Sequence, residues 1–363
     1  GENCGVRAHA SLLADELNRE GVVCTEHWLA RREPSPRAAR AEVLAWTRSL
    51  RAELECSRPD AVLFHYSVFA YSYRGFPVFV HPTVSALRES AVPTIAFMHE
   101  LAYPWTLGGL RGGAWAIAHR ALLVEVMSVC TAAIVTTDWR AEWLATRRWL
   151  PQRPVALAPV FSNLPPPTAR PCPARDATVL GMFGYSYDEP AIALVLDALR
   201  LLWDRGLQVK LSLLGAPGRE SPLAETWLNR ARARGLDDAL SFAGPLPAQE
   251  LSDALASCDV LLFADGAGPS SRKGTLAGSL ASGRPVVATD GPRTWSELVR
   301  AEAAIVVEPT SGALAGAVVE LLADERELEA LGRRGRAFAE ERMGVGWSVG
   351  VVKRWMKSTT ASS

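Results

Sequence analysis

The sequence predicts an α/β protein with two doubly wound domains, each built on a parallel sheet. Short apolar runs alternate with helical patterns along almost the whole chain. The runs are apolar at successive positions, as expected for parallel strands that helices cover on both faces. A proline-rich stretch near the middle interrupts this alternation. The chain has 363 residues, and one hydrophobic core usually supports no more than roughly 250–300, which favours two domains.

The first domain is expected to cover residues 1–160. Helices are predicted near 5–19, 36–54, 83–89 and 114–129, and strands at 22–27, 61–64, 94–98 and 132–135. His65 and His99 directly follow two of these strands, at the edge where parallel sheets gather functional side chains. Thr136 or Thr137 is expected to cap a further helix after the last strand, because a threonine oxygen accepts from the free N–H groups of a helix start.

Residues 161–176 are expected to form a linker, because five prolines between Asn163 and Pro173 remove backbone donors and fix φ. A second domain, 177–340, is expected to follow. Its strands are predicted at 179–183, 209–214, 240–242, 260–263, 286–288 and 304–307, with helices between them. The last segment, 341–363, is predicted to be mainly an amphipathic helix.

Residues 265–276 carry the clearest functional signal. A buried strand ends in a Gly/Ser loop, which leads through Arg272 and Lys273 into a helix. Free N–H groups at a helix start, with two cations beside them, are typical of a phosphate site. Lys273 stands out because the chain has four lysines against thirty-five arginines, and an ammonium acts on phosphate as a point charge. The alternative interpretation is a solvated basic pair.

The composition excludes several classes of protein. A net charge of zero argues against a dedicated nucleic-acid binder, since no overall positive charge attracts a polyanion. No apolar run reaches the roughly 20 residues that span a bilayer, and the start shows no signal segment. Six cysteines lie without C-x-x-C spacing, so neither a zinc site nor a disulfide framework is predicted. We therefore expect a cytoplasmic protein, and its preference for arginine and alanine indicates a high-GC bacterial source.

Six short motifs follow one another along the chain. They are T-I-A-F-M-H at 94–99, G-M-F-G-Y at 181–185, L-S-L-L-G at 211–215, F-A-G-P-L at 242–246, C-D-V-L-L-F at 258–263 and G-R-P-V-V-A at 283–288. Their order and spacing resemble the retaining, GT-B-fold glycosyltransferases of family 4, also called glycosyl transferases group 1. The resemblance covers nearly the whole chain. It implies two Rossmann-like domains that face a cleft, with the C-terminal helix crossing back to the first domain.

The family's activity would be transfer of a sugar from a nucleotide-diphosphate-sugar donor to an acceptor, with retention at the anomeric carbon. Arg272, Lys273 and the N–H groups of Gly274 and Thr275 would then stabilise the departing nucleoside diphosphate, and His99 would contact donor or acceptor. Donor-binding residues are expected at Gly184, Tyr185, Gly244, Leu246, Ser270, Ser271, Gly274 and Thr275. Acceptor-side residues are expected at Gly5, Tyr103 and Trp105. No metal or cofactor is expected besides the nucleotide-sugar co-substrate, in line with the lack of a D-x-D motif.

Two features depart from the family pattern. Members usually carry a pair of glutamates, separated by seven residues, that hold the donor sugar hydroxyls and the ribose. Alignment on the G-R-P turn at 283–285 puts Ser270 and Gly278 at these positions. The basic residue often found after the first strand of the second domain is also missing, because residues 184–190 are acidic. We hypothesise that the pair Arg272 and Lys273 compensates for this charge.

The start of the chain departs as well. It opens with a glycine segment directly before a helix, where this fold places the loop after its first strand. We expect either that a leading strand is missing because the start is truncated or placed too late, or that the first sheet lacks its central strand.

Three other functions are weighed against this one. G-A-G-P-S-S at 266–271, with Asp290 downstream, partly imitates an NAD fingerprint, but its third glycine is a serine and it does not open its domain. A non-catalytic nucleotide-sugar-binding relative would fit the loss of the carboxylate pair. A nucleotide-sugar epimerase would share the architecture and would need carboxylates such as Asp188, Glu189 or Asp265 for proton transfer.

The remaining signals concern partners and location. The C-terminal helix is interpreted as a brace on the first domain, with peripheral contact to the inner membrane surface as the alternative. His65 is a weaker candidate than His99. The other histidines, His9, His27, His81 and His119, are interpreted as structural because none lies at metal-ligand spacing. The expected partners are the donor and a small-molecule or glycan acceptor, from a cell-surface glycan or a natural product.

Overall fold

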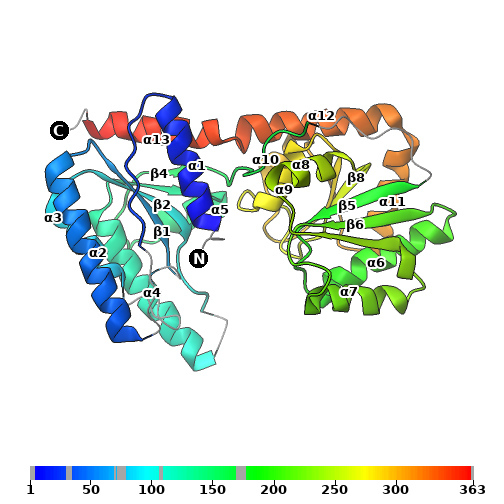
Figure 1. The fold of residues 1–363 in the computed structure, drawn as a ribbon, viewed down its shortest axis with the longest axis horizontal. Coiled ribbons are helices and arrows are strands. Elements are labelled where there is room, and N and C mark those ends of the chain that lie inside the picture. Colours follow the sequence, from blue (N-terminus) through cyan, green and yellow to red (C-terminus); the bar gives the residue numbers. More distant parts are fainter. Residues whose placement is uncertain are drawn as a thin grey trace. The chain divides into compact units, whose positions relative to one another are not determined.

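The computed structural model describes residues 5–29, 35–68, 71, 79–105, 109–168 and 177–360 (Figure 1). The chain forms two compact units. The first takes in the residues up to Pro159 and, again, those from Val345 onwards, whereas the second runs from Val160 to Gly344. Each unit is built on its own parallel sheet. The predicted α/β class, with two parallel-sheet domains, is therefore confirmed.

The first unit holds a four-stranded sheet with the order β1-β2-β3-β4, in which all neighbouring strands are parallel. Its strands are β1 (Val62–Ser67), β2 (Thr94–Glu100), β3 (Ala132–Val135) and β4 (Val155–Leu157). Its helices are α1 (Gly5–Arg19), α2 (Pro36–Ser57), α3 (Val80–Ser90), α4 (Gly109–Val129), α5 (Asp138–Ala145) and α13 (Val345–Thr360). Every residue of β3 is buried, as are the first five of β2, which explains why these strands are apolar at successive positions.

The strand predicted at 22–27 is wrong. Residues 22–29 have no strand partner, and Val23 is 93% exposed. The backbone N–H of Cys24 donates to Asn18 Oδ1 at 2.9 Å, so a side chain supplies the bond that a ladder would have made. The sequence does not predict β4, because this strand has only three residues and all three are half-buried.

The predicted cap of α5 is right in position only. Thr137 is the N-cap residue of α5, with an extended backbone, but its hydroxyl makes no capping hydrogen bond. The Thr136 hydroxyl instead accepts from Arg140 Nη1 at 2.9 Å. This contact ties α5 to the end of β3.

The second unit holds a six-stranded parallel sheet with the order β10-β9-β8-β5-β6-β7. Its strands are β5 (Thr178–Phe183), β6 (Val209–Leu214), β7 (Leu240–Gly244), β8 (Val260–Phe263), β9 (Val286–Thr289) and β10 (Ile305–Val307). Its helices are α6 (Glu189–Asp204), α7 (Pro222–Arg232), α8 (Ala248–Ala256), α9 (Gly274–Ala281), α10 (Ser296–Arg300), α11 (Ser311–Ala323) and α12 (Glu325–Arg342), with a short 3₁₀ turn, Asp237–Ala239. The chain winds outward from β5 in both directions, so the strand order reverses between β5 and β8. Doubly wound sheets bind ligands at the carboxyl ends of the strands at this reversal.

Two apolar cores cover the two faces of this sheet. Leu262 of β8 points into a core that includes α6 and α11, whereas its neighbours Leu261 and Phe263 point into the core that includes α8, α9 and α12. Successive side chains of a strand face opposite ways, so a strand buried on both sides must be apolar throughout. This is the pattern that the sequence displays.

The proline-rich stretch is described up to Thr168, and residues 169–176 of the predicted linker lie outside the described residues. The described part packs on the second unit. The N–H and hydroxyl of Thr168 donate to the carboxylate of Asp253 at 2.6 and 2.9 Å. The Ser252 hydroxyl donates to the Pro165 carbonyl at 2.6 Å. Residues 160–168 are thus fixed along α8.

The last helix, α13, lies with the first unit beside α1 (Figure 1). Trp347 Nε1 donates to the Leu157 carbonyl of β4 at 3.2 Å, and Lys353 Nζ pairs with the Glu20 carboxylate at 2.7 Å. Val351 and Val352 are buried. The apolar face of α13 is therefore turned toward the protein.

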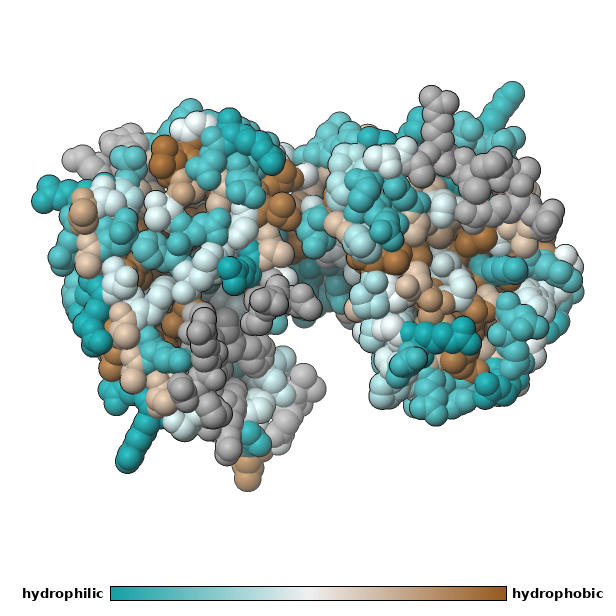
Figure 2. Space-filling model, in the orientation of Figure 1, coloured by the Kyte–Doolittle hydropathy of each residue, from teal (hydrophilic) through white to brown (hydrophobic). Residues whose placement is uncertain are grey.

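The surface is mixed in character. On the face shown in Figure 2, hydrophilic residues cover most of the exterior and hydrophobic residues form scattered spots. Within the described ranges, no helix combines the length and the apolar character needed to cross a membrane.

Candidate functional site

Several of the predicted donor residues lie at the strand reversal of the second unit. Gly184 follows β5 and has φ of +69°, a conformation that favours glycine. A Cβ atom at Gly184 would lie 2.9 Å from the Thr275 methyl carbon. The loop after β5 therefore touches the first turn of α9. The structure brings together Gly184, Gly274 and Thr275, with Arg272 and Lys273 next to them in the chain.

The start of α9 presents free N–H groups. Lys273 is the N-cap residue and provides no side-chain cap. The first N–H groups of a helix have no partner within the helix, and they carry the positive end of its dipole. Gly274 and Thr275 are both half-buried. The start of α9 therefore has the features that an anion site requires, and the binding of phosphate there stays a prediction.

The two cations beside this turn differ in their surroundings. Lys273 Nζ forms an ion pair with the carboxylate of Asp265, which also accepts from the Ala267 N–H at 2.9 Å. Arg272 is exposed and has no ion pair among the residues that the structure describes. The charge of Lys273 is partly balanced by Asp265. Arg272 is consequently the cation whose charge is open to a ligand.

The two positions that hold glutamates in the resembling family are closed by packing. Ser270 is 4% exposed, and its carbonyl accepts from the Lys273 N–H at 3.1 Å. A Cβ at Gly278 would lie 2.7 Å from Phe183 Cε1 and 3.3 Å from a Leu164 methyl carbon. The ring of Phe183 therefore occupies the space that a side chain at position 278 would need.

Four predicted donor residues, Tyr185, Gly244, Leu246 and Ser271, offer little side-chain contact at the strand reversal. The Tyr185 ring is fully buried in the core against Phe242, and burial raises the pKa of its hydroxyl. Gly244 ends β7 and Leu246 follows it, and because β6 separates β7 from β5, both residues lie two strands away. Ser271 is buried, and its carbonyl accepts from the Val160 N–H at 2.8 Å. It fixes the loop to the segment that precedes the proline-rich stretch.

The other predicted residues, His99, Gly5, Tyr103 and Trp105, lie in the first unit. His99 stands near the end of β2, where its Nε2 lies 3.1 Å from Nδ1 of His65 on the neighbouring strand β1. The ring of His9, on α1, meets His99 edge to face with ring centres 5.2 Å apart. Ligand nitrogens of the three histidines all lie within 4.8 Å of one another.

Sequence spacing missed this cluster. The spacing of the histidines predicts a structural role for His9 and makes His65 a weaker candidate than His99, because no two of them lie at metal-ligand spacing in the chain. One signal was available: His65 and His99 both follow apolar strands, and adjacent parallel strands end at the same edge. The register of β1 and β2 sets His65 opposite Phe97, whose ring stacks on both His65 and His99 at 5.1 Å.

Burial keeps these imidazoles neutral. It lowers the pKa of His9 to about 4, and burial with the charge of His9 lowers the pKa of His65 to about 3. The pKa of His99 falls well below its usual value through burial, then through His65, His9 and Arg140. Arg140 Nη1 donates to the His99 carbonyl at 2.5 Å. At neutral pH, His99 is a neutral group that both donates and accepts hydrogen bonds.

Three neutral histidines are also a ligand set for zinc, whose nitrogen ligands lie about 2.0–2.1 Å from the metal. Here the ligand atoms would have to draw together, and the guanidinium of Arg140 stands beside them. The same positive charge that lowers the pKa of His99 disfavours a cation. We therefore interpret the cluster as a hydrogen-bonding group.

The acceptor-side residues have different environments. Gly5 opens α1 and is exposed. The Tyr103 N–H donates to His119 Nδ1 at 3.0 Å, and its ring packs edge to face on Trp115. Trp105 is 56% exposed, with the guanidinium of Arg120 over its ring at 4.2 Å. Tyr103 holds the loop in place, whereas Trp105 is available to a ligand.

Comparisons with known proteins agree with this geometry. Residues 177–324 match the model of the family described as glycosyl transferases group 1. A search of curated proteins found no match. Among solved structures, sucrose-phosphate synthase from Thermosynechococcus elongatus has a TM-score of 0.66 at 15% identity, over 99% of this chain and 94% of that one. Anabaena HepE in complex with UDP and glucose has a TM-score of 0.66 at 15% identity, over 97% and 96%.

The fold alone does not separate the chemistries. A putative UDP-N-acetylglucosamine 2-epimerase from Listeria monocytogenes is also similar, with a TM-score of 0.59 at 13% identity, over 98% of this chain and 94% of that one. The matched family model covers residues 177–324, a range that includes β5, β8 and the first turn of α9. The chain thus has the GT-B fold, and its glycosyl transferases group 1 domain identifies it as a glycosyltransferase.

Proposed function

We propose that the protein transfers a sugar from a nucleoside-diphosphate-sugar donor to a hydroxyl acceptor, with retention of configuration and without a metal ion. One observation carries the proposal: the uncapped first turn of α9, flanked by Arg272 and Lys273, lies at the strand reversal of the second unit. Anabaena HepE, which shares this fold, has been solved in complex with UDP and glucose and with UDP-glucose, which supports a diphosphate donor.

In the proposed reaction, the bond between the anomeric carbon and the diphosphate oxygen breaks, and its electron pair stays on the diphosphate. The acceptor oxygen bonds to the anomeric carbon on the same face. The acceptor proton passes to the departing phosphate oxygen, so no enzymic nucleophile is consumed. Arg272 and the N–H groups of Gly274 and Thr275 stabilise the charge that develops. Lys273, oriented by Asp265, adds a second cation.

The same arrangement supports the proposed independence from a metal ion. Two cations and a helix dipole supply the positive charge that a divalent ion would otherwise bring to the diphosphate. His99 is proposed to hydrogen-bond the donor or the acceptor as a neutral imidazole, positioned by His65. The proposed setting is the bacterial cytoplasm, which fits Cys24, Cys56 and Cys130 standing as thiols rather than in disulfides. We propose that α13 braces the first unit, since its apolar face is buried there.

Calorimetry with UDP, GDP, ADP and dTDP, with and without Mg²⁺, tests donor binding. One nucleotide should bind equally well in both conditions, and the variant Arg272→Ala/Lys273→Ala should lose that binding. Arg205→Ala is the matched control, because Arg205 is an exposed cation at the far end of α6. Retained affinity in the double variant would refute the role of the pair. No binding of any nucleotide would refute the proposed donor class.

A non-catalytic nucleotide-sugar binder is the second candidate, favoured by the closed position at Gly278. Slow hydrolysis of the bound donor separates the two functions. Proton NMR of the released sugar should show the anomer of the donor first if the enzyme retains configuration. Tight donor binding with no hydrolysis and no transfer would support the binder instead.

A further inference from the structure

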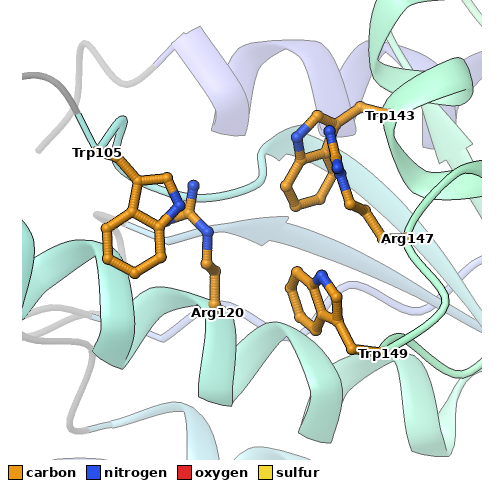
Figure 3. Close-up of a pocket in the computed structure, with 5 residues that line it drawn as sticks. All are labelled: Trp105, Arg120, Trp143, Arg147 and Trp149. Carbon is orange, nitrogen blue, oxygen red and sulfur yellow. The ribbon is translucent and has the colours of Figure 1, made fainter.

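A second site lies in the first unit, where three tryptophans and two arginines line a cavity of about 340 Å³ (Figure 3). The lining residues are Trp105, Arg120, Trp143, Arg147 and Trp149. Trp105 follows β2, Arg120 is on α4, Trp143 is on α5, and the other two follow α5. Small-molecule sites occupy roughly 300–1,000 Å³. The cavity is therefore large enough for one small ligand.

The two arginines have no carboxylate partner among the residues that the structure describes. Arg120 Nη1 donates to the carbonyls of Tyr103 and Ala116, at 2.9 and 2.8 Å, which leaves its other nitrogens for a ligand. Arg147 Nε is buried and, within the described part of the chain, has no hydrogen-bond partner. Burial and the charge of Arg147 lower the pKa of Arg120. Two like charges share this space, and an anion would relieve their repulsion.

The tryptophans hold the guanidinium groups in place. Arg120 lies over Trp105 at 4.2 Å, and Arg147 lies over Trp143 at 5.3 Å. The rings of Trp143 and Trp149 meet edge to face at 6.0 Å. Figure 3 shows Arg120 beside Trp105 and Arg147 beside Trp143, with the Trp149 indole below Trp143. Stacking orients each guanidinium plane, so its N–H edge is ready for a bidentate anion.

Indole faces also suit the apolar C–H face of a sugar ring, and Trp105 and Trp149 are 56% and 45% exposed. The site is connected to His99 through the chain. The loop that leaves β2 after His99 carries Trp105, and α5, whose Arg140 donates to the His99 carbonyl, carries Trp143. A sugar that stacks on indoles and bears an anionic group would satisfy both kinds of side chain.

We propose that this cavity binds the acceptor through an anionic group, so that the acceptor is an anionic carbohydrate. The inference rests on the proposed function, since it assigns the acceptor of that transferase. The Arg120 and Arg147 guanidinium groups bind the phosphate or carboxylate of the ligand, and the tryptophans bind its ring.

Calorimetry on the full-length protein with glucose 6-phosphate, glucuronate, inorganic phosphate and glucose tests the proposal. Both anionic sugars should bind more tightly than phosphate or glucose. Arg147→Gln, which removes the charge but keeps a polar side chain, should weaken their binding roughly 10- to 100-fold, the worth of a charged hydrogen bond. The control is Arg148→Gln, at the exposed neighbouring position. Arg120→Lys keeps the positive charge but loses the planar guanidinium, so the affinity for the anionic sugars should fall, but by less than in Arg147→Gln.

Vesicles of phosphatidylglycerol and of phosphatidylcholine identify the source of the anion. Binding to phosphatidylglycerol in addition to the anionic sugars, weakened by Arg147→Gln, would assign the anion to a lipid headgroup, whereas binding of the free sugars without the vesicles would assign it to a soluble acceptor. Equal binding of glucose and the anionic sugars, or unchanged binding by Arg147→Gln, would overturn the proposal. Binding of UDP, GDP, ADP and dTDP, measured on the same samples, keeps the two inferences apart. Binding of a nucleotide without binding of any anionic sugar would overturn this proposal only. Binding of the anionic sugars without binding of any nucleotide would overturn the donor site only.

Discussion

At the scale of single residues, the proposed donor site depends on the absence of a side chain at Gly184. Gly184 combines a left-handed backbone with a close approach to the Thr275 methyl group. A non-glycine residue pays about 1–2 kcal/mol for that backbone conformation. Any side chain there also pushes against the turn that is proposed to hold the diphosphate.

Gly184→Ala should therefore weaken nucleotide binding and lower the free energy of unfolding by more than the backbone cost alone. Gly206→Ala is the matched control, because Gly206 has φ of +83° and a Cβ atom added there would meet no other atom within 4 Å. Urea unfolding should give about 1–2 kcal/mol of loss for Gly206→Ala and more for Gly184→Ala. Adding Thr275→Ser, which removes the methyl group, should recover the excess. Equal losses at the two glycines would contradict the packing argument.

A second glycine pair tests the closed position of the missing glutamate. Gly278→Ala should destabilise the protein, because its Cβ would lie 2.7 Å from Phe183 Cε1. Gly316→Ala, in α11 and with open space around it, should stabilise by about 0.5–1 kcal/mol. Thermal unfolding measures both changes: the melting temperature should fall for Gly278→Ala and rise for Gly316→Ala. A stabilising Gly278→Ala would mean that Phe183 moves aside and that a carboxylate could be restored.

At the scale of elements, the histidine cluster joins α1, β1 and β2 and makes the first unit sensitive to acid. His9, His65 and His99 have a lowered pKa in the folded state and an ordinary one, about 6.5, when unfolded. The unfolded chain thus binds more protons below pH 6.5. The neighbouring cation Arg140 acts in the same direction on His99.

The free energy of unfolding should be highest above pH 6.5 and fall steadily as the pH drops toward 4. Each pKa unit of difference contributes about 1.4 kcal/mol per group, so His9 alone contributes on the order of 3 kcal/mol by pH 4. His9→Gln should flatten the fall, whereas His27→Gln, an exposed histidine, should leave the slope unchanged. Guanidinium unfolding between pH 4 and 8 measures both. A slope equal in the two variants would show that His9 is not neutral in the folded state.

Elements also show where sequence reasoning succeeds. β8 and β9 are apolar at almost every position because they are buried on both faces, and an apolar run between glycine turns is readable from the sequence. β4 is three half-buried residues at the sheet edge and carries no such pattern. Val22 and Val23 favour an extended backbone, but a strand forms only where a neighbouring strand is in place to pair with it. The local sequence does not show whether such a neighbour exists, and residues 22–29 have none. The turn before α9 was found because its chemistry is local, whereas the histidine cluster and the Trp/Arg cavity each depend on several elements coming together.

The whole molecule has separate cores in its two units, so its unfolding is expected to show more than one transition. A nucleotide that binds the second unit should raise the transition temperature of that unit only. At a nucleotide concentration a hundred times Kd, the free energy of unfolding of that unit should rise by about 2.7 kcal/mol. Calorimetric scans with and without UDP measure it. A shift of both transitions by the same amount would show that the units unfold together.

The helix α13 adds a consequence for how the protein is made. The first unit is interrupted by the 185 residues from Val160 to Gly344, and its last helix is synthesised only after them. At roughly 5–20 residues per second, the ribosome needs about 10 to 40 s to cross that stretch. During this time the nascent first unit exposes the surface of α1 on which α13 will pack. The half-finished chain is thus a client for chaperones, and a stop codon after Gly344 would release a protein that never leaves that state.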